Sequence, residues 1–122
     1  MRAAWLLRED YGIETRVVNV HTVKPLDVAA LVQAAEQTRL IVTAEEHQVG
    51  GFGNIVAGAI LRHRQNYQQP LLLDMLGVND RFGVSGKPWE LMRNFGLCAE
   101  HMAERVLRLV ERRRGGAKPL AA

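Results

Sequence analysis

The pattern of apolar and polar positions along the chain predicts five helices. They cover residues 2–10, 28–38, 54–65, 88–95 and 99–113. In the second of these segments the apolar residues recur with the period of one helix face. Asp27 suits the N-cap of that helix, Pro88 suits the first turn of the fourth, and Gly12 and Gly96 suit helix ends.

Three short apolar runs lie between these helices and predict strands. They are Thr15–Val20, Leu40–Ala44 and Leu71–Leu76. Only Thr43 interrupts the second run, and a strand without polar alternation is typical of a parallel sheet that is covered on both faces. The order of the elements therefore predicts an α/β fold, a three-layer α/β/α sandwich with a mostly parallel sheet.

We expect one domain over residues 1–114, followed by a disordered tail over residues 115–122. The first predicted helix begins at residue 2 with no strand before it. Three strands also make a thin sheet for this architecture. The sequence therefore predicts a domain that lacks its first strand, in a chain that is a fragment or starts at an internal methionine.

Composition and charge narrow the class of protein. The chain is 48% hydrophobic and 24% charged, and no apolar run reaches the roughly 18–20 residues that cross a bilayer. The N-terminus is charged too early for a signal peptide, and Cys98 is the only cysteine, so we expect a cytoplasmic protein without a membrane partner. Residues 112–114 carry much of the net charge of +3; we expect the solvated end of a helix there and no nucleic-acid partner, because no aromatic residues interleave the arginines.

The loop over residues 45–53 carries the most candidate chemistry. It joins the carboxyl end of a predicted strand to a helix N-terminus, where unpaired N–H groups favour anions. Gly51 and Gly53, with Asp74 about 20 residues later, match part of a dinucleotide-binding pattern, but Val56 stands at its third glycine. In the alternative interpretation, the glycines let the helix pack closely on the sheet. The charged side chains then face a neighbouring surface. The candidates for an interface or a regulatory cleft here are Glu45, Glu46, His47, Gly50, Gly51 and Gly53.

Other polar residues give weaker signals. His21 and His47 both follow predicted strands, where α/β folds bind ligands, whereas His63 and His101 lie on helices and are expected to be exposed. Cys98 lies in an apolar setting and is expected to be a buried thiol.

In the long loop over residues 77–86, Asp80 and Arg81 are candidates for an interface, since an arginine there suits a phosphate or a carboxylate of a partner domain. No set of these residues forms a catalytic centre or has the spacing of a metal site.

Taken together, four segments resemble the C-terminal domain of the transketolase family. They are Arg16–Asp27, Ile41–His47 with Gly50–Gly53, Gly77–Gly83 with Ser85-Gly86, and Gly96-Leu97. The resemblance covers about residues 2–111. The resemblance depends on the order and spacing of these four segments. The sequences most similar to transketolases made as two separate chains are those around Lys24-Pro25-Leu26-Asp27 and Asp80–Gly86.

The resemblance implies what the complete enzyme contains. Thiamine diphosphate and Mg²⁺ lie between a pyrophosphate-binding and a pyrimidine-binding domain, across the interface of a homo-oligomer, and the reaction moves a two-carbon ketol unit between sugar phosphates. The family's metal and diphosphate motif and its activating glutamate are absent here, so no cofactor is expected on this chain alone. Its expected role is to pack against the pyrimidine domain, within the same chain or as a separate subunit. Family members also begin this domain with a strand that this chain lacks, so independent folding is in question.

Two other functions remain open from the sequence. One is an autonomous anion- or nucleotide-binding module that uses the loop over residues 50–53. The other is the same domain in a 1-deoxyxylulose-5-phosphate synthase or in the beta subunit of a 2-oxoacid dehydrogenase, since these families share parts of the same motifs.

Overall fold

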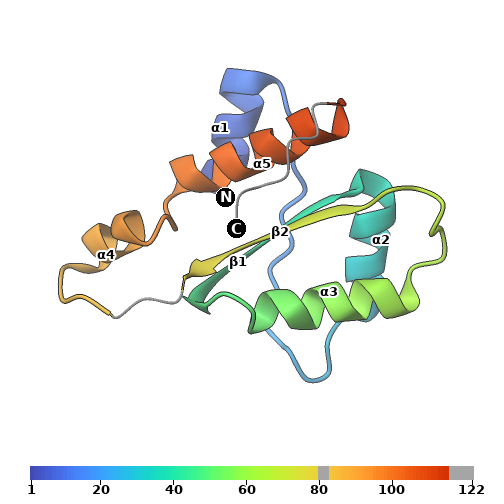
Figure 1. Cartoon of the computed structure of the whole chain (residues 1–122), viewed down its shortest axis with the longest axis horizontal. Coiled ribbons are helices and arrows are strands. Elements are labelled where there is room, and N and C mark those ends of the chain that lie inside the picture. The colour runs from blue at the N-terminus through green and yellow to red at the C-terminus, as the bar shows by residue number, and fades with distance from the viewer. Residues whose placement is uncertain (80–82, 116–122) are drawn as a thin grey trace.

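Five helices and two strands make up the fold in the computed structural model, which describes residues 1–79 and 83–115 (Figure 1). In chain order they are α1 (Arg2–Tyr11), α2 (Val28–Thr38), β1 (Leu40–Gln48), α3 (Phe52–His63), β2 (Leu72–Val78), α4 (Pro88–Asn94) and α5 (Ala99–Arg113). All five helices predicted from the sequence are present. The disordered tail predicted over residues 115–122 lies, apart from Gly115, outside the described residues.

Local signals fix where several helices begin and end. The Asp27 side chain accepts a hydrogen bond from the Ala30 N–H at 3.0 Å, which confirms this residue as the N-cap of α2. Gly12 adopts the left-handed conformation (φ 65°) that closes α1. The basic run ends α5 as predicted, and Arg113 donates a hydrogen bond to the carbonyl oxygen of Thr38.

The sheet consists of two parallel strands, β1 and β2. Leu40 lies beside Leu72, and the register continues to Ala44 beside Leu76. It then shifts, so that Gln48 pairs with Val78. The strand predicted over Leu40–Ala44 is longer in the structure, because β1 continues through residues 45–48.

The strand predicted over Thr15–Val20 is wrong, because this segment is irregular in the structure. Residues 14–20 make no backbone hydrogen bond to any other part of the chain that the structure describes. The Arg16 guanidinium instead hydrogen-bonds Gln37 and Gln33 of α2. β-branched residues favour a strand only where a neighbouring strand pairs with them, and this segment pairs with neither β1 nor β2.

Helices cover both faces of the sheet. In Figure 1, α1 and α5 lie on one side of the strands and α2 and α3 on the other, which gives the predicted three layers. The core cluster between α2, α3 and the sheet is formed by Leu31, Ala35, Val56 and Ile60. Leu7 of α1 and Leu109 of α5 are each 1% exposed on the opposite side. Within the described residues, no helix is long and apolar enough to span a membrane.

Candidate functional site

Glu45 occupies the helix N-terminus that the sequence singled out. Its side chain points back from β1 to the start of α3, where Oε1 accepts the Phe52 N–H at 3.0 Å and Oε2 accepts the Gly53 N–H at 2.8 Å. A carboxylate at this position satisfies two unpaired donors and interacts favourably with the helix dipole. The site that would attract a phosphate is therefore filled by the chain's own carboxylate.

The glycines around this carboxylate allow the close packing. A Cβ at Gly53 would lie 2.8 Å from the Met75 sulfur and 2.8 Å from the Thr43 hydroxyl, so α3 approaches the sheet more closely than a larger residue allows. A Cβ at Gly51 would lie 3.0 Å from Glu45 Oε1, and Gly50 has a φ of 103°. These contacts support the packing interpretation of the loop over the dinucleotide interpretation.

The predicted site residues Glu46, His47 and His21 form no contact with Glu45 that accompanies this cap. Glu46 and His47 are exposed on the last part of β1, and His21 is exposed in the irregular connection before α2. His21 therefore does not follow a strand, contrary to the prediction, because the segment before it forms none. Asp80 and Arg81 lie outside the described residues.

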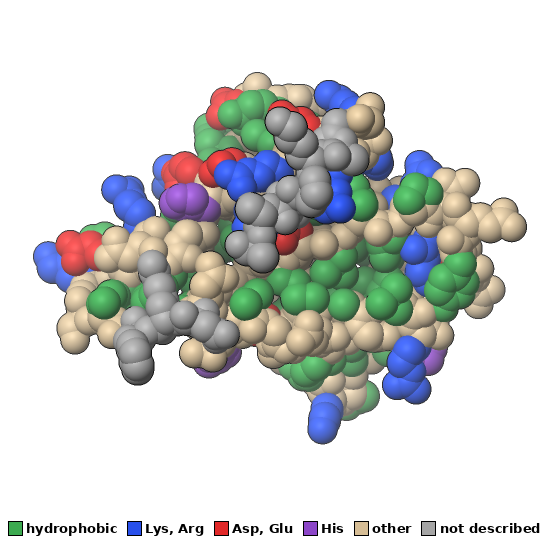
Figure 2. All heavy atoms as spheres, in the orientation of Figure 1, with side chains coloured by type: hydrophobic (Ala, Val, Ile, Leu, Met, Phe, Trp, Pro, Cys, Tyr) green, Lys and Arg blue, Asp and Glu red, His purple; other side chains and the backbone are tan. Residues whose placement is uncertain are grey.

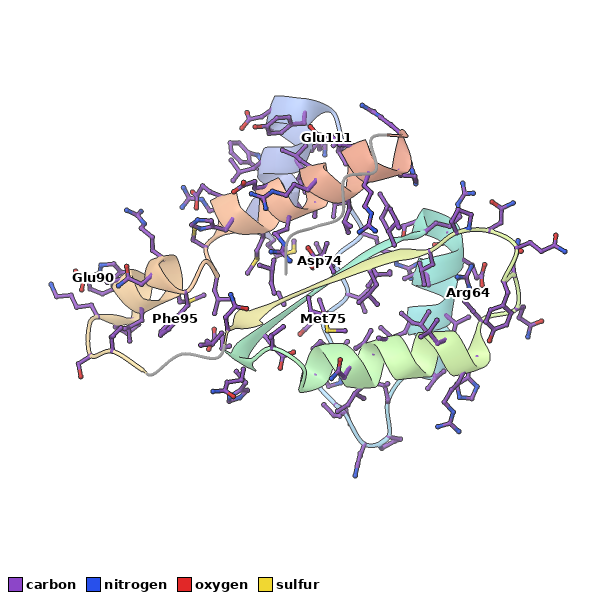
Figure 3. All side chains as sticks on the ribbon, viewed as in Figure 1. Arg64, Asp74, Met75, Glu90, Phe95 and Glu111 are labelled. Carbon is purple, nitrogen blue, oxygen red and sulfur yellow. The ribbon has the colours of Figure 1, made fainter. Side chains whose placement is uncertain are left out.

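Asp74 and Arg105 form an ion pair that was not predicted from the sequence. Asp74 lies on β2 and is 9% exposed (Figure 3). It accepts hydrogen bonds from Nε and Nη2 of Arg105 in α5, each at 2.5 Å. Its Oδ1 also accepts the Met75 N–H at 2.9 Å. The Asp74 carboxylate raises the pKa of Arg105 through this hydrogen bond. Asp74 is therefore engaged inside the fold and does not present a ribose-binding acid. Two features of the sequence could have indicated this pair. Asp74 is a single acidic residue in an apolar strand, and Arg105 lies on the inward side of a helix.

A thiol and an imidazole meet at the start of α5. The Cys98 sulfur lies 2.9 Å from His101 Nδ1, and Cys98 is half-buried at the N-cap position. The prediction of a buried core thiol is therefore wrong, because the N-cap lies at the edge of the core. The predicted exposure of His63 and His101 is confirmed.

These features define a class of protein: an α/β domain in which Glu45 of β1 and Asp74 of β2 hold helices against the sheet. The sequence matches the family described as transketolase, C-terminal domain, over residues 1–102. It is 34% identical to an apulose-4-phosphate transketolase subunit of Phocaeicola vulgatus, over 91% of this chain and 34% of that protein. It is 40% identical to the 1-deoxy-D-xylulose-5-phosphate synthase of Synechococcus sp. (strain JA-3-3Ab), over 94% of this chain and 17% of that protein.

A solved structure shows the same fold. It is described as a split gene transketolase, inactive beta4 tetramer, and it matches 89% of this chain and 33% of its own chain, with a TM-score of 0.71 and 34% identity. The chain belongs to the transketolase C-terminal domain family. It spans about a third of the transketolase subunit and of the split-gene transketolase, and a smaller share of the synthase.

The cofactor that the family implies does not fit the residues on this chain. Thiamine diphosphate with Mg²⁺ needs acidic metal ligands and donors for a diphosphate. Within residues 1–79 and 83–115 no group of three or more His, Cys, Asp or Glu side chains could hold a metal ion. The N-terminus of α3, which has the donors, carries the carboxylate of Glu45.

Proposed function

We propose that this chain is the C-terminal domain of a thiamine-diphosphate-dependent enzyme that transfers two-carbon ketol units between sugar phosphates. The family match and the similarity to a transketolase subunit support this assignment. In the complete enzyme the cofactor and Mg²⁺ are bound by pyrophosphate- and pyrimidine-binding domains, in the same chain or in a separate subunit. The proposed enzyme is a cytoplasmic homo-oligomer, and the tetramer of the split-gene relative supports the assembly.

Within this enzyme the domain serves as a packing and interface element without catalytic residues of its own. The observation that carries this role is the double hydrogen bond between Glu45 and the start of α3, because the carboxylate occupies the helix N-terminus that the sequence indicated as a phosphate site. Asp74 is likewise held by Arg105. The charged groups best placed for chemistry thus stabilise the fold.

The surface left for the companion domains combines exposed polar residues with apolar ones. His21, Glu46 and His47 are exposed, and we propose them, together with Asp80 and Arg81, as interface residues. Figure 2 shows hydrophobic side chains gathered between α5 and α3, on the face along which β2 runs. Leu72, Leu73 and Met75 of β2 are only half-buried. An apolar band rimmed by polar groups is typical of an interface between domains.

The test is a pull-down from an extract of the source organism with the tagged 122-residue chain. The eluate is assayed for ketol transfer between sugar phosphates with and without added thiamine diphosphate. We expect recovery of a companion polypeptide together with cofactor-dependent activity. A variant in which Glu46 and His47 are both alanine serves as the matched control for the interface and should recover less activity. A folded chain that recovers no such activity from extracts in which the activity is present would contradict the proposal.

A synthase role is the second candidate, and the 40% identity to a 1-deoxy-D-xylulose-5-phosphate synthase favours it. The same eluate distinguishes the two. Formation of 1-deoxy-D-xylulose 5-phosphate, without ketol transfer between sugar phosphates, would assign the chain to a synthase. The packing and interface role of the domain is the same in both cases.

A further inference from the structure

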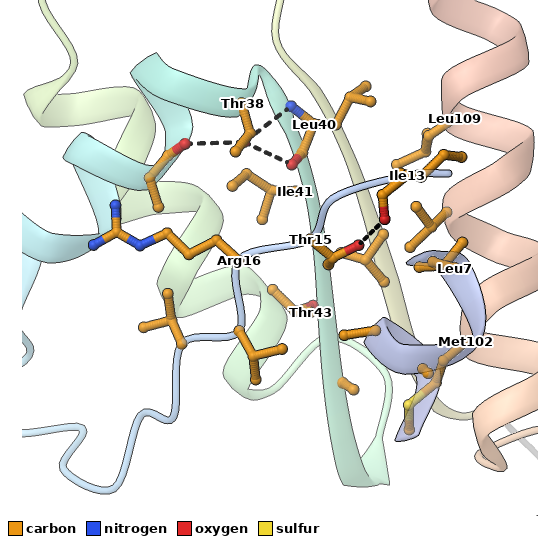
Figure 4. A pocket seen from close by; sticks show the side chains of 18 of the residues that line it. Leu7, Ile13, Thr15, Arg16, Thr38, Leu40, Ile41, Thr43, Met102 and Leu109 are labelled. Carbon is orange, nitrogen blue, oxygen red and sulfur yellow. Dashed lines mark hydrogen bonds between the residues drawn. The ribbon is translucent and has the colours of Figure 1, made fainter. Parts of the chain in front are cut away.

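Two hollows in the described part of the chain differ in character. The larger, of about 730 Å³ beside β1, is lined mainly by apolar side chains such as Leu7, Ile41 and Leu109 (Figure 4). The smaller is a pocket of about 190 Å³ at the carboxyl end of β2, and charged side chains of α5 line it. Because ligands of α/β folds bind at the carboxyl ends of the strands, the smaller pocket is the better candidate for a polar ligand.

One face of α5 supplies the charged lining of the smaller pocket. His101, Arg105 and Arg108 follow one another at helical spacing, so they share one face of the helix. Glu104 lies beside them and is the one carboxylate of the lining among the described residues. The lining therefore sets two guanidinium cations against one carboxylate, and His101 adds a further positive charge when it is protonated.

The Arg105 guanidinium is held in place before any ligand binds. Asp74, which is 9% exposed and does not line the pocket, accepts hydrogen bonds from its Nε and Nη2. A guanidinium has five N–H donors, so three remain after these two hydrogen bonds. Because Arg105 also lines the pocket, an acceptor there can use these donors without the entropy loss of ordering a free side chain.

Arg108 is held less firmly. It pairs with Glu104 one turn earlier on α5, and the two side chains are 50% and 52% exposed. An exposed ion pair of this kind contributes little to stability, because water and salt screen it. An anion in the pocket can therefore draw Arg108 away from Glu104 with little loss of stability.

The end of β2 supplies uncharged donors to the same pocket. The Val49 N–H bonds the Val78 carbonyl at 2.9 Å, so the backbone groups of Val78 point to β1. By the alternation along a strand, the N–H of Gly77 points to the opposite edge, and Gly77 lines the pocket. Asn79 also lines it and brings a side-chain amide with further N–H donors. Arginine side chains together with N–H groups suit a phosphate, whose oxygens all accept hydrogen bonds.

The volume of the pocket limits the size of its ligand. A water molecule takes up about 30 Å³ in the liquid, so 190 Å³ has room for about six non-hydrogen atoms. Sites for cofactors and other ligands of that size take about 300–1,000 Å³, so the pocket is too small for a nucleotide or for thiamine diphosphate. One phosphate group with the first carbon of an ester fits.

We propose that the smaller pocket binds one phosphate group, of inorganic phosphate or of a phosphomonoester such as a sugar phosphate, through Arg105, Arg108 and the Gly77 N–H. His101 contributes its Nε2, because its Nδ1 lies 2.9 Å from the Cys98 sulfur. This chain alone forms the site, so the proposal does not depend on the proposed function. It goes beyond that function by assigning a ligand to a domain whose proposed role is packing.

The test is an NMR titration of the full 122-residue chain with inorganic phosphate, ribose 5-phosphate and ribose, at constant ionic strength. We expect both phosphates to shift the amide resonances of Gly77, Asn79 and His101 until they saturate, and ribose to leave these resonances unchanged. Tighter binding of ribose 5-phosphate than of inorganic phosphate would support the site and assign it to a sugar phosphate. Equal binding would support the site and assign it to free phosphate.

Two variants of one ion pair should change the affinity in opposite directions. Arg108→Gln removes a cation and should weaken phosphate binding at least about tenfold. Glu104→Gln removes the competing carboxylate and should strengthen binding about threefold or more. Both variants break the same exposed ion pair, so its loss by itself cannot produce opposite effects. Arg62→Gln is the matched control for net charge, because Arg62 is exposed on α3 and does not line the pocket, and it should leave the affinity unchanged.

Two results would overturn the proposal. One is the absence of saturable shifts at Gly77 and Asn79 in the folded chain. The other is an equal weakening by Arg108→Gln and Arg62→Gln, which would show a response to net charge alone. If the chain folds only with its companion polypeptide, the same variants are compared in the recovered complex by retention of radiolabelled phosphate, with the same expected order. None of these readouts is an enzyme activity, so their failure is distinguishable from failure of the pull-down.

Discussion

Asp74 in β2 and Arg105 in α5 face each other through two hydrogen bonds of 2.5 Å. The pair connects the sheet to the last helix across 31 positions of sequence. Asp74 is the one acidic residue within its otherwise apolar strand, and a buried carboxylate without a partner is costly. The Asp74 carboxylate needs a cation that β2 does not supply, and the hydrogen bonds to Arg105 therefore hold α5 over the sheet.

We predict that Arg105→Met destabilises the chain by about 3 kcal/mol, because it leaves the Asp74 carboxylate buried without a cation. In the double variant Asp74→Leu/Arg105→Met most of this loss should be recovered, since an apolar pair replaces the ion pair. Urea unfolding followed by circular dichroism measures both changes. Equal losses in the single and the double variant would show that the pair makes no specific contribution.

The carboxylate at the start of α3 gives a second prediction. Glu45→Ala removes the acceptor of the Phe52 and Gly53 N–H groups and should lower the free energy of unfolding by about 1–2 kcal/mol. Glu46→Ala is the matched control, because its side chain is exposed one position further along β1. We expect no measurable change in its urea midpoint. If the two variants unfold at the same urea concentration, Glu45 is not a cap.

Two glycines of α3 should respond to alanine in opposite directions. At Gly53 the new Cβ would meet Met75 and Thr43 at 2.8 Å, so Gly53→Ala should destabilise by about 1–3 kcal/mol. At Gly58 nothing lies within 4 Å of the new Cβ, so Gly58→Ala should stabilise by about 0.5–1 kcal/mol through helix propensity. Thermal unfolding of the two variants beside the native chain measures both effects. A stabilising Gly53→Ala would show that α3 does not pack on the sheet at this distance.

The stability of the start of α5 should depend on pH through Glu100. A backbone hydrogen bond at Glu100 lowers the pKa of its carboxyl below the usual 4.5, assisted by a hydrogen bond from Cys98 and by the charges of Arg2 and Arg93. Because the pKa is lower in the folded state, the Glu100 carboxylate adds to the free energy of unfolding above pH 4.5. This stabilisation is lost as the pH falls through the pKa of the folded state. The urea midpoint of the native chain should therefore exceed that of Glu100→Gln at pH 7. The two should converge in acid, and a difference that grows as the pH falls would contradict this assignment.

Much of the fold could be predicted because its signals are local. The helix over residues 99–113 was predicted with the bounds that α5 has, and the Asp27 cap was predicted from one residue type in one position. Such features depend on hydrogen bonds within a few residues. The motif order that indicates the transketolase family is also a property of the sequence itself.

The predictions that were wrong or left open concern contacts between segments that are far apart in the sequence. The segment over residues 15–20 has the composition of a strand, but it forms no backbone hydrogen bond with another described segment, and pairing between distant segments cannot be inferred from propensity. The loop over residues 45–53 allowed a phosphate site or a packing loop. Only the position of the Glu45 side chain against α3 favoured the second.

The sequence by itself determined the helices, the two apolar strands that form β1 and β2, and the family, because each depends on residue type and spacing along the chain. The tertiary structure decided the partners of charged side chains, above all Asp74 with Arg105, and the close approach of α3 to the sheet at Gly53. These depend on contacts between residues far apart in sequence. The physical reason is that a hydrogen bond to a distant group is set by how helices pack on the sheet, and that packing is a property of the whole domain.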